Sequence, residues 1–501
     1  MTQSQNRLTP LHIPRDEFIK IGHDLVDKLA DFFDSLGDRK VKPDEGVREI
    51  RRVLGGGDIP EHGIPPAEIL DRAFELLTNH SLFNSHPRFF GYITAPPAPI
   101  STLADFMAAA MNPNVGAWQI APMATEIELQ TIRWIAELIN FPTSCGGVLV
   151  SGGNMANFVG FLAGRKYQFP GDVRKQGTSA FEGKPRVYCS SATHTWVQKA
   201  ADLFGLGTEA IRWIETDSQQ RMNVKALVKQ LEADLDNGDI PLMVIGTAGS
   251  VSTGAIDPLP ELAAVCKQYN LWFHVDGAYG GFAACLPTAP EDLKGLSLAD
   301  SVAIDPHKWL YQPLEAGCAL VRDPQIQVET FSYHPDYYRW EDVIKEEVPT
   351  NLVDYSPQNS RGFRALKVWM SLQQAGRIGY QKMLSEDIQL AQRLFDLAEE
   401  HPELQASSCE LSITTFRFVP DGVNPDDENN HKMLNELNGD LLTTLQRNGE
   451  MFVSNAIVDD RFLLRACVVN FRTSWHDIEA LPEIVVRTGR EVFTSLSAAR
   501  S

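Results

Sequence analysis

Four short segments place reactive side chains directly after apolar runs that are typical of buried strands. One of them contains Lys308, which follows the run 301–304 and stands between His307 and Trp309. Burial at a strand end desolvates an ammonium group and favours the neutral amine. Such an amine can act as a nucleophile and form a Schiff base with an aldehyde. An ordinary surface lysine is the alternative when Lys308 is taken alone.

A second segment offers a carboxylate in a similar position. Asp276 follows the apolar run 271–275, where a charge is costly unless a cation pairs with it. The small residues Gly277 and Ala278 come next and leave space for a flat ligand. A capping role for Asp276 at the start of the next segment is the structural alternative.

The other two segments supply a glycine turn and an imidazole. The turn SGGN (151–154) closes the run 147–151 and precedes a helical pattern, so its main-chain amides can approach a phosphate. His194 follows the run 186–190 and could stack on a planar ring or carry a proton. A purely structural turn and a structural histidine are the alternatives for each feature by itself.

Taken together, the four segments match what pyridoxal phosphate requires. Its phosphate binds at a helix start, its pyridinium nitrogen pairs with an acid, and its aldehyde reacts with a lysine amine. The interval between Asp276 and Lys308 leaves room for one helical crossover. We therefore expect pyridoxal phosphate as the cofactor.

The elements that carry these segments alternate between strands and helices. Six short apolar runs lie between residues 146 and 322, and helical patterns separate them. The runs are 147–151, 186–190, 242–247, 271–275, 301–304 and 317–321. This alternation predicts an α/β fold with a mostly parallel sheet flanked by helices, and a ligand at the carboxyl ends of its strands.

The two ends of the chain have different patterns. Residues 17–36 carry one apolar stripe on a charged helix, and shorter helices are predicted at 46–54 and 66–78. The apolar faces of these helices must be buried, either against the main domain or against a second subunit. After a long helix at 361–399, we predict strands at 411–419, 451–455 and 463–471 and helices at 431–447 and 476–497.

We therefore expect three parts. They are an N-terminal helical segment (1–95), a large cofactor-binding α/β domain (96–385) and a small C-terminal α+β domain (386–501).

Two motifs resemble signatures of the group II pyridoxal-phosphate-dependent amino-acid decarboxylases, the family of aromatic-L-amino-acid and glutamate decarboxylases. They are HVDGAYGG (274–281) and DPHKWL (305–310). Further similar segments are HPRFFGY (86–92), LADFMAAAMNPNVGAWQIAPMATEIE (103–128), SGGNMANF (151–158) and SRGFRALKVW (360–369). The resemblance implies a fold-type I enzyme that decarboxylates an L-amino acid to an amine and CO2.

The resemblance also implies roles for individual residues. Lys308 resembles the Schiff-base lysine, Asp276 the partner of the pyridinium nitrogen, and His194 the imidazole stacked on one ring face. Further cofactor contacts are expected from Gly153, Asn154, Thr247, Ala278 and His307. Asp305 is a departure, because many relatives have asparagine there, near the phosphate. A carboxylate would be repelled unless it points away, so we leave Asp305 out of the phosphate set.

Two other assignments come from the same resemblance. Tyr337 aligns with the loop tyrosine that reprotonates the substrate Cα, with Tyr338 as the neighbouring alternative and simple packing as the structural one. Relatives that make aldehydes carry phenylalanine there, so Tyr337 favours decarboxylation over aldehyde synthesis. Transamination on the same cofactor is a further alternative.

The substrate pocket is the remaining expectation. Tyr92 and Trp118 match positions near the substrate side chain, although both could belong to the core. Arg88 and Arg472 stay open as partners of an acidic substrate. An aromatic substrate is therefore preferred over a glutamate-like or diamine one.

Composition limits the partners and the compartment. The chain has 501 residues, 43% hydrophobic and 22% charged, and a net charge of −20, which disfavours nucleic acid and membrane surfaces. Its seven cysteines are scattered without a metal-type pairing, so we expect reduced thiols, no metal and a cytoplasmic protein. The first residues lack the apolar core of a signal peptide. The family resemblance implies a homodimer with its N-terminal helices wrapped around the partner.

Overall fold

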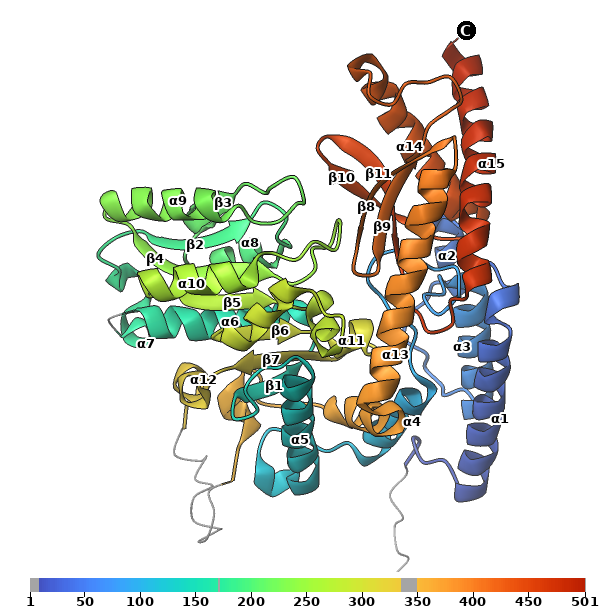
Figure 1. Cartoon of the computed structure of the whole chain (residues 1–501). Helices are drawn as coiled ribbons and strands as arrows, with labels where there is room; N and C mark the ends of the chain where they lie inside the picture. The colour runs from blue at the N-terminus through green and yellow to red at the C-terminus, as the bar shows by residue number, and fades with distance from the viewer. Residues whose placement is uncertain (1–8, 170–171, 335–348, 501) are drawn as a thin grey trace, which may run out of the picture.

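A seven-stranded sheet forms the middle layer of the larger part of the molecule, on the left in Figure 1. The computed structural model describes residues 9–169, 172–334 and 349–500. In sheet order the strands are β1 (Gly146–Val150), β7 (Gly317–Val321), β6 (Ser301–Ile304), β5 (Trp272–Asp276), β4 (Ile240–Thr247), β2 (Pro185–Ser190) and β3 (Ile211–Ile214). The six predicted runs all form strands of this sheet, which confirms the α/β fold class.

The sheet is mostly parallel, as predicted. Only β7 runs against its neighbours, since it pairs antiparallel with both β1 and β6, while β6, β5, β4, β2 and β3 are joined by parallel ladders. The edge strand β3 was missed by the sequence analysis. It has only four residues, and Trp213 within it is exposed, so no continuous apolar run marks it.

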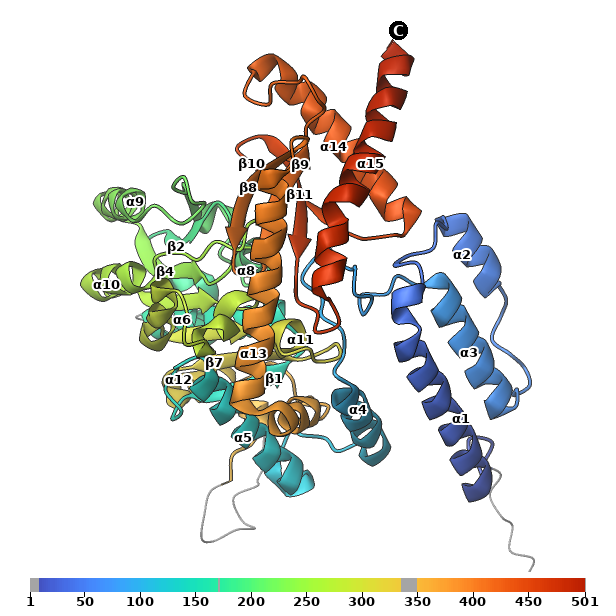
Figure 2. The ribbon, with the colours of Figure 1, turned by 45° about the vertical axis from the view of Figure 1, so that its right-hand side comes forward.

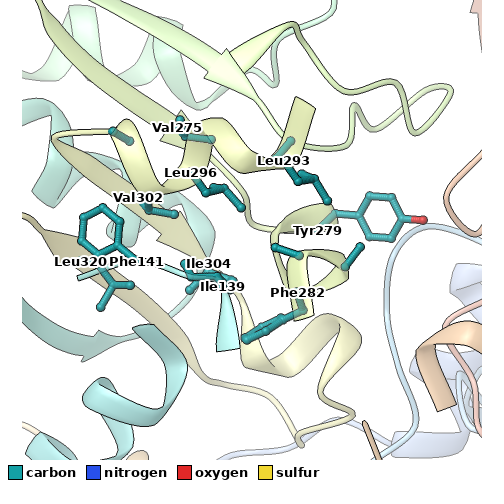
Figure 3. Packing of buried hydrophobic residues seen from close by; sticks show 14 of the residues in the cluster. Ile139, Phe141, Val275, Tyr279, Phe282, Leu293, Leu296, Val302, Ile304 and Leu320 are labelled. Carbon is teal, nitrogen blue, oxygen red and sulfur yellow. The ribbon is translucent and has the colours of Figure 1, made fainter. Parts of the chain in front are cut away.

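Both faces of the sheet are buried, and successive residues of one strand enter different cores. In β5, Phe273 and Val275 join one apolar cluster, while Trp272 joins the cluster on the opposite face. Figure 3 shows part of the first cluster, where Val275 and Val302 lie near Leu296. This explains why the strands have continuous apolar sequences rather than alternating ones.

Helices cover both faces of the sheet (Figure 1). α6 (Gly153–Gln168) crosses β5 closely, because a Cβ on its Gly160 would come within 2.6 Å of the His274 ring. The other helices of this part of the chain are α4 (Pro99–Met111), α5 (Pro122–Leu138), α7 (Val173–Gln176), α8 (Trp196–Leu203), α9 (Val224–Asp236), α10 (Leu259–Tyr269), α11 (Pro306–Trp309) and α12 (Pro324–Phe331).

The N-terminal helices lie beside one another and away from the large sheet. They are α1 (Arg15–Asp34), α2 (Val47–Leu54) and α3 (Pro66–His80), which confirms the three predicted helices. Figures 1 and 2 both show α1 packed along α3 with one long side uncovered by the rest of the chain.

The C-terminal part contains a four-stranded antiparallel sheet, in the order β10 (Ser454–Val458), β11 (Arg461–Cys467), β9 (Ile413–Phe418) and β8 (Leu404–Glu410). Helices α13 (Ala365–Glu400), α14 (Glu428–Asn448) and α15 (Trp475–Arg500) accompany it. The strand expected at 411–419 begins at 413 instead, because Leu411 takes a positive φ of 54° in the turn of a hairpin. β8 was missed because its sequence, LQASSCE, is largely polar.

The predicted division at residue 385 falls inside α13, which runs through both parts of the molecule (Figure 1). The three-part division therefore stays a prediction. Within the described residues, no helix combines the length and apolar character needed to cross a membrane. All seven cysteines have free thiols.

Candidate active site

A cavity of about 230 Å³ lies at the carboxyl ends of β4, β5 and β6, beside the start of α6. All four segments singled out from the sequence contribute to its walls. The lining residues are Gly153, Asn154, Asn157, Ala192, His194, Thr247, Gly249, Val251, Asp276, Ala278, Tyr279, Asp305 and Lys308. The strand alternation predicted this location, and of the expected cofactor contacts only His307 is absent from the lining.

Lys308 projects into this cavity from α11, one turn beyond β6. Its Nζ lies 3.1 Å from Asp305 Oδ2, and its side chain is 21% exposed. The following residues fix this turn, since Trp309 Nε1 and the Tyr311 hydroxyl both donate to Asp387 Oδ2, at 2.9 and 2.7 Å. Burial raises the pKa of the Asp387 carboxyl to about 7, although both donors oppose that shift. The lysine is therefore carried on a short, well-anchored segment.

Asp276 ends β5 and is almost fully buried. Its Oδ2 accepts a hydrogen bond from Trp196 Nε1 at 2.7 Å, and its Oδ1 accepts one from the main-chain N–H of Ala278 at 3.1 Å. These two donors offset the burial of the charge. Both carboxylate oxygens are therefore held by donors of the same chain at the cavity wall.

His194 lies across the cavity, just before α8. Its Nδ1 accepts a hydrogen bond from the main-chain N–H of Trp196 at 3.3 Å. Burial lowers the pKa of this imidazole, and the nearby Asp276 carboxylate offsets the effect only in part. A neutral imidazole with an accepting Nδ1 carries its proton on Nε2. His194 thus presents a flat ring to the cavity, and burial favours the neutral form of that ring.

The glycine turn brings the start of α6 against the cavity. Gly152 takes a φ of 141°, and a Cβ there would lie 3.1 Å from His307 Cε1. A Cβ on Gly153 would lie 2.7 Å from Asp305 Oδ2 and 3.3 Å from the Ala278 methyl group. Glycines are therefore required for the close approach, and the start of a sixteen-residue helix, where main-chain amides can bind an anion, lies at the cavity.

His307 lies behind the turn rather than on the cavity wall. Its Nδ1 accepts a hydrogen bond from the main-chain N–H of Ala316 at 3.1 Å, and its Nε2 is 3.5 Å from Asp305 Oδ2. Burial lowers the pKa of this ring as well.

Asp305 faces the cavity and does not point away from it. Its Oδ2 lies between Lys308 and His307, whereas its buried Oδ1 has no hydrogen-bond partner in the described structure. The attraction of the lysine ammonium accounts for this orientation, because an ion pair offsets the burial of a carboxylate. The three-residue spacing to Lys308 on a helical turn is the signal that could have indicated it.

Two more residues were missed by the sequence analysis. Asn157, on the same face of α6 as Gly153, accepts a hydrogen bond from His274 Nε2 at 2.7 Å. Its four-residue spacing from Gly153 could have revealed it. Trp196, which donates to Asp276, gave no such signal because the partners lie far apart in the sequence.

The two residues predicted to lie near the substrate are not brought to the cavity wall. Tyr92 is 60% exposed and its ring leans on Phe452, with 6.0 Å between the centroids. Trp118 is half-buried, and its Nε1 donates to Glu126 Oε1 at 2.9 Å. Tyr337 lies outside the described residues.

Comparison with known proteins identifies the family. Residues 57–419 match the model of the pyridoxal-dependent decarboxylase conserved domain. The chain belongs to the pyridoxal-dependent decarboxylase family. Its predicted class, a carboxy-lyase that uses pyridoxal phosphate, is thereby confirmed.

Individual relatives agree with this assignment over nearly the whole chain. The decarboxylase is 31% identical to an aromatic-L-amino-acid decarboxylase of Bacillus atrophaeus, over 93% of this chain and 94% of the other. It is 29% identical to tyrosine decarboxylase 3 of Petroselinum crispum, over 96% and 93% of the two chains. The crystal structure of Oryza sativa TDC with PLP and tryptamine superposes with a TM-score of 0.89 at 26% identity, over 97% and 99% of the chains.

The cavity of the decarboxylase fits pyridoxal phosphate. An amine, a carboxylate, an imidazole face and a helix start surround one space. Thr247 and Asn157 also line it, and Thr247 Oγ1 and Asn157 Nδ2 are buried without a hydrogen-bond partner in the described part of the chain. Buried polar atoms are usually paired, so these two are available to a polar ligand.

Proposed function

We propose that this decarboxylase converts an aromatic L-amino acid to the corresponding amine and CO2. The observation that supports this reaction most strongly is the placement of Lys308, Asp276 and His194 around one cavity. The aromatic class is supported by relatives named for aromatic, tyrosine and tryptophan substrates. No arginine lines the described cavity to receive the distal carboxylate of an acidic substrate.

Each residue would hold a different part of the cofactor. When bound, pyridoxal phosphate supplies an electron sink that accepts the electron pair left at Cα by the loss of CO2. Asp276 would hold the proton on the ring nitrogen, while His194 and Ala278 would pack against the two ring faces. The amides of Gly153 and Asn154, with His307 behind them, would bind the phosphate.

Lys308 would supply the amine that binds the aldehyde group. Asp305 Oδ2, 3.1 Å from that amine, forms an ion pair with its ammonium form and thereby keeps it directed into the cavity. Thr247, with its free hydroxyl on the lining, would form a further hydrogen bond.

Tyr337 would deliver the proton that replaces CO2 at Cα. Its support is the alignment of the segment that follows His334 with the family loop. A tyrosine hydroxyl is a suitable general acid when it is held within hydrogen-bond reach of the carbon.

We also propose a homodimer in which the partner completes the substrate pocket. Exposed apolar side chains occur on α4, in the segment after it and at the start of α5, and Tyr92 is exposed as well. The exposed side chains are Leu103, Phe106, Met107, Met111, Ile120 and Met123. Such a surface is unusual on a monomer.

Seven free thiols suit a reducing compartment, so we place the protein in the cytoplasm, without nucleic acid or membrane partners.

The proposed reaction is tested by product analysis on a panel of aromatic, acidic and basic amino acids. We expect stoichiometric amine and CO2 from an aromatic substrate. Aldehyde with ammonia would instead indicate oxidative chemistry, the activity for which the related phenylacetaldehyde synthase of Rosa is named. A preference for glutamate would contradict the aromatic assignment.

A further inference from the structure

Trp196 is the one residue of α8 that bonds to two residues of the site. Its indole Nε1 donates to Asp276 Oδ2 at 2.7 Å, and its main-chain N–H donates to His194 Nδ1 at 3.3 Å. The side chain is completely buried. A single residue therefore forms hydrogen bonds with both the carboxylate and the imidazole of the cavity wall.

The indole is held in place by rings at right angles to it. The His274 ring lies 5.6 Å from the indole at an interplanar angle of 83°, and Phe161 lies 6.4 Å away at 87°. His274 is itself fixed by Asn157 Oδ1 at 2.7 Å and Ser301 Oγ at 2.8 Å. Burial lowers the pKa of His274 to about 4, so this support is uncharged at neutral pH. The indole N–H has little freedom to leave Asp276.

We propose that Trp196 is a positioning residue that sets Asp276 and His194 in register for the cofactor ring. The inference rests on the proposed function. With Trp196 on Oδ2 and Ala278 on Oδ1, the plane of the Asp276 carboxylate is fixed by two donors. Its remaining lone pairs are left for the ring nitrogen. The main-chain N–H of the same residue bonds to His194 whatever side chain stands at 196, so the indole N–H adds the link that relates Asp276 to the stacking ring.

If Trp196 only filled space in the core, a different property of its side chain would matter. A core aromatic needs shape and apolar surface, which phenylalanine supplies nearly as well, whereas positioning needs the N–H group. Loss of a hydrogen bond to a charged acceptor is expected to raise the dissociation constant of the cofactor about tenfold or more. Loss of the N–H alone therefore separates the two roles.

The test compares Trp196→Phe with Trp272→Phe. Trp272 is also buried, and its Nε1 donates to Ser301 Oγ at 2.9 Å without lining the cavity. The dissociation constant for pyridoxal phosphate is measured by titrating the apoprotein and following the visible absorbance of the bound cofactor. We expect it to rise at least about tenfold in Trp196→Phe and less than about threefold in Trp272→Phe. The position of the absorbance band is expected to change only in Trp196→Phe.

A second comparison shows whether Trp196 acts through Asp276. In an Asp276→Ala background, adding Trp196→Phe is expected to change the dissociation constant less than about twofold, because the acceptor is already gone. If Trp196→Phe does not fold, benzothienylalanine at position 196 keeps the shape of the indole and lacks only the N–H. Its expected effect is the same.

Cofactor binding equal to wild type after loss of the N–H, or an equal loss in both backgrounds, would overturn the inference. Failure of the wild-type protein to bind pyridoxal phosphate would instead overturn the proposed function, so the two failures are distinguishable.

Discussion

Two regions of the molecule differ in how completely their side chains find partners within the same chain. They are the cavity at the edge of the large sheet and the outer face of the N-terminal half. At the cavity, Asp276, Lys308 and His194 each have a defined partner in the same chain. On the outer face, α1 and α4 leave large apolar side chains such as Phe106 exposed. One chain is therefore enough to assemble the reactive groups, whereas the exposed apolar face is the surface on which we propose that a second copy packs. The predictions below test the two halves of this contrast.

The largest effect is expected from Lys308→Ala. Removing the amine eliminates the covalent anchor and a proton carrier, so amine formation should fall at least about 10⁴-fold while the fold is retained. The measurement is amine production at saturating cofactor and substrate. Lys294→Ala, on an exposed turn where Lys294 pairs with Glu291, is the matched control and should behave as wild type. Appreciable turnover by Lys308→Ala would refute the role of this lysine.

The next effect concerns Asp387, which anchors the lysine segment. Burial raises its pKa from about 3.8 to about 7, so between these values the folded protein holds a proton that the unfolded chain has released. The free energy of unfolding must then decrease as pH rises through this window. Asn at 387 is neutral at every pH and should abolish the decrease, which amounts to at most about 4 kcal/mol.

Urea unfolding of wild type and Asp387→Asn at pH 5, 6 and 7 measures this difference. Asp300→Asn is a useful comparison, because burial also raises the pKa of that carboxyl but it lies away from the lysine segment. An equal dependence of the free energy of unfolding on pH in wild type and Asp387→Asn would contradict the raised pKa of Asp387.

The third-largest effect is expected from Tyr337→Phe. Amine formation should be about 10²-fold lower and cofactor affinity unchanged, because only the proton donor is removed. Steady-state rates and cofactor titration measure the two effects separately. Tyr338→Phe is the matched control. If Tyr338→Phe lost activity and Tyr337→Phe did not, the proton donor would be the neighbouring residue.

The smallest of these effects concerns the outer face. Phe106→Glu places a charge within the proposed interface, where burial is unfavourable, and should weaken the dimer more than about tenfold. Sedimentation velocity across a concentration series measures the change. Ile457→Glu alters an equally exposed apolar residue on β10 and should leave the dimer intact. A wild-type protein that is monomeric at micromolar concentration would contradict the proposed assembly.

The same contrast decides what could be predicted from the sequence. The continuous apolar runs around β5 and β6 predicted buried strands, and Asp276 and Lys308 were identified because each stands just after such a run. The edge strand β3 and the polar strand β8 were missed because neither is buried on both faces. Burial thus determines how clearly a strand can be recognised from its sequence.

Within the site, residue types at strand ends were predictable, but their partners were not. The hydrogen bond from Trp196 to Asp276 depends on how α8 packs over the sheet, and no local pattern encodes that contact. The inward orientation of Asp305 follows from its ion pair with Lys308, whereas the sequence-based expectation considered only repulsion between this carboxylate and a phosphate. Tyr92 and Trp118 were placed by resemblance alone, and a single chain leaves both away from the cavity wall.

The most direct test of the central claim is to locate the cofactor on the chain. The purified protein is incubated with pyridoxal phosphate and reduced with borohydride, and its peptides are then mapped by mass spectrometry. We predict one reduced adduct per chain, on the peptide that contains Lys308. An unmodified Lys308 peptide, with no adduct or with the adduct on another lysine, would contradict the account.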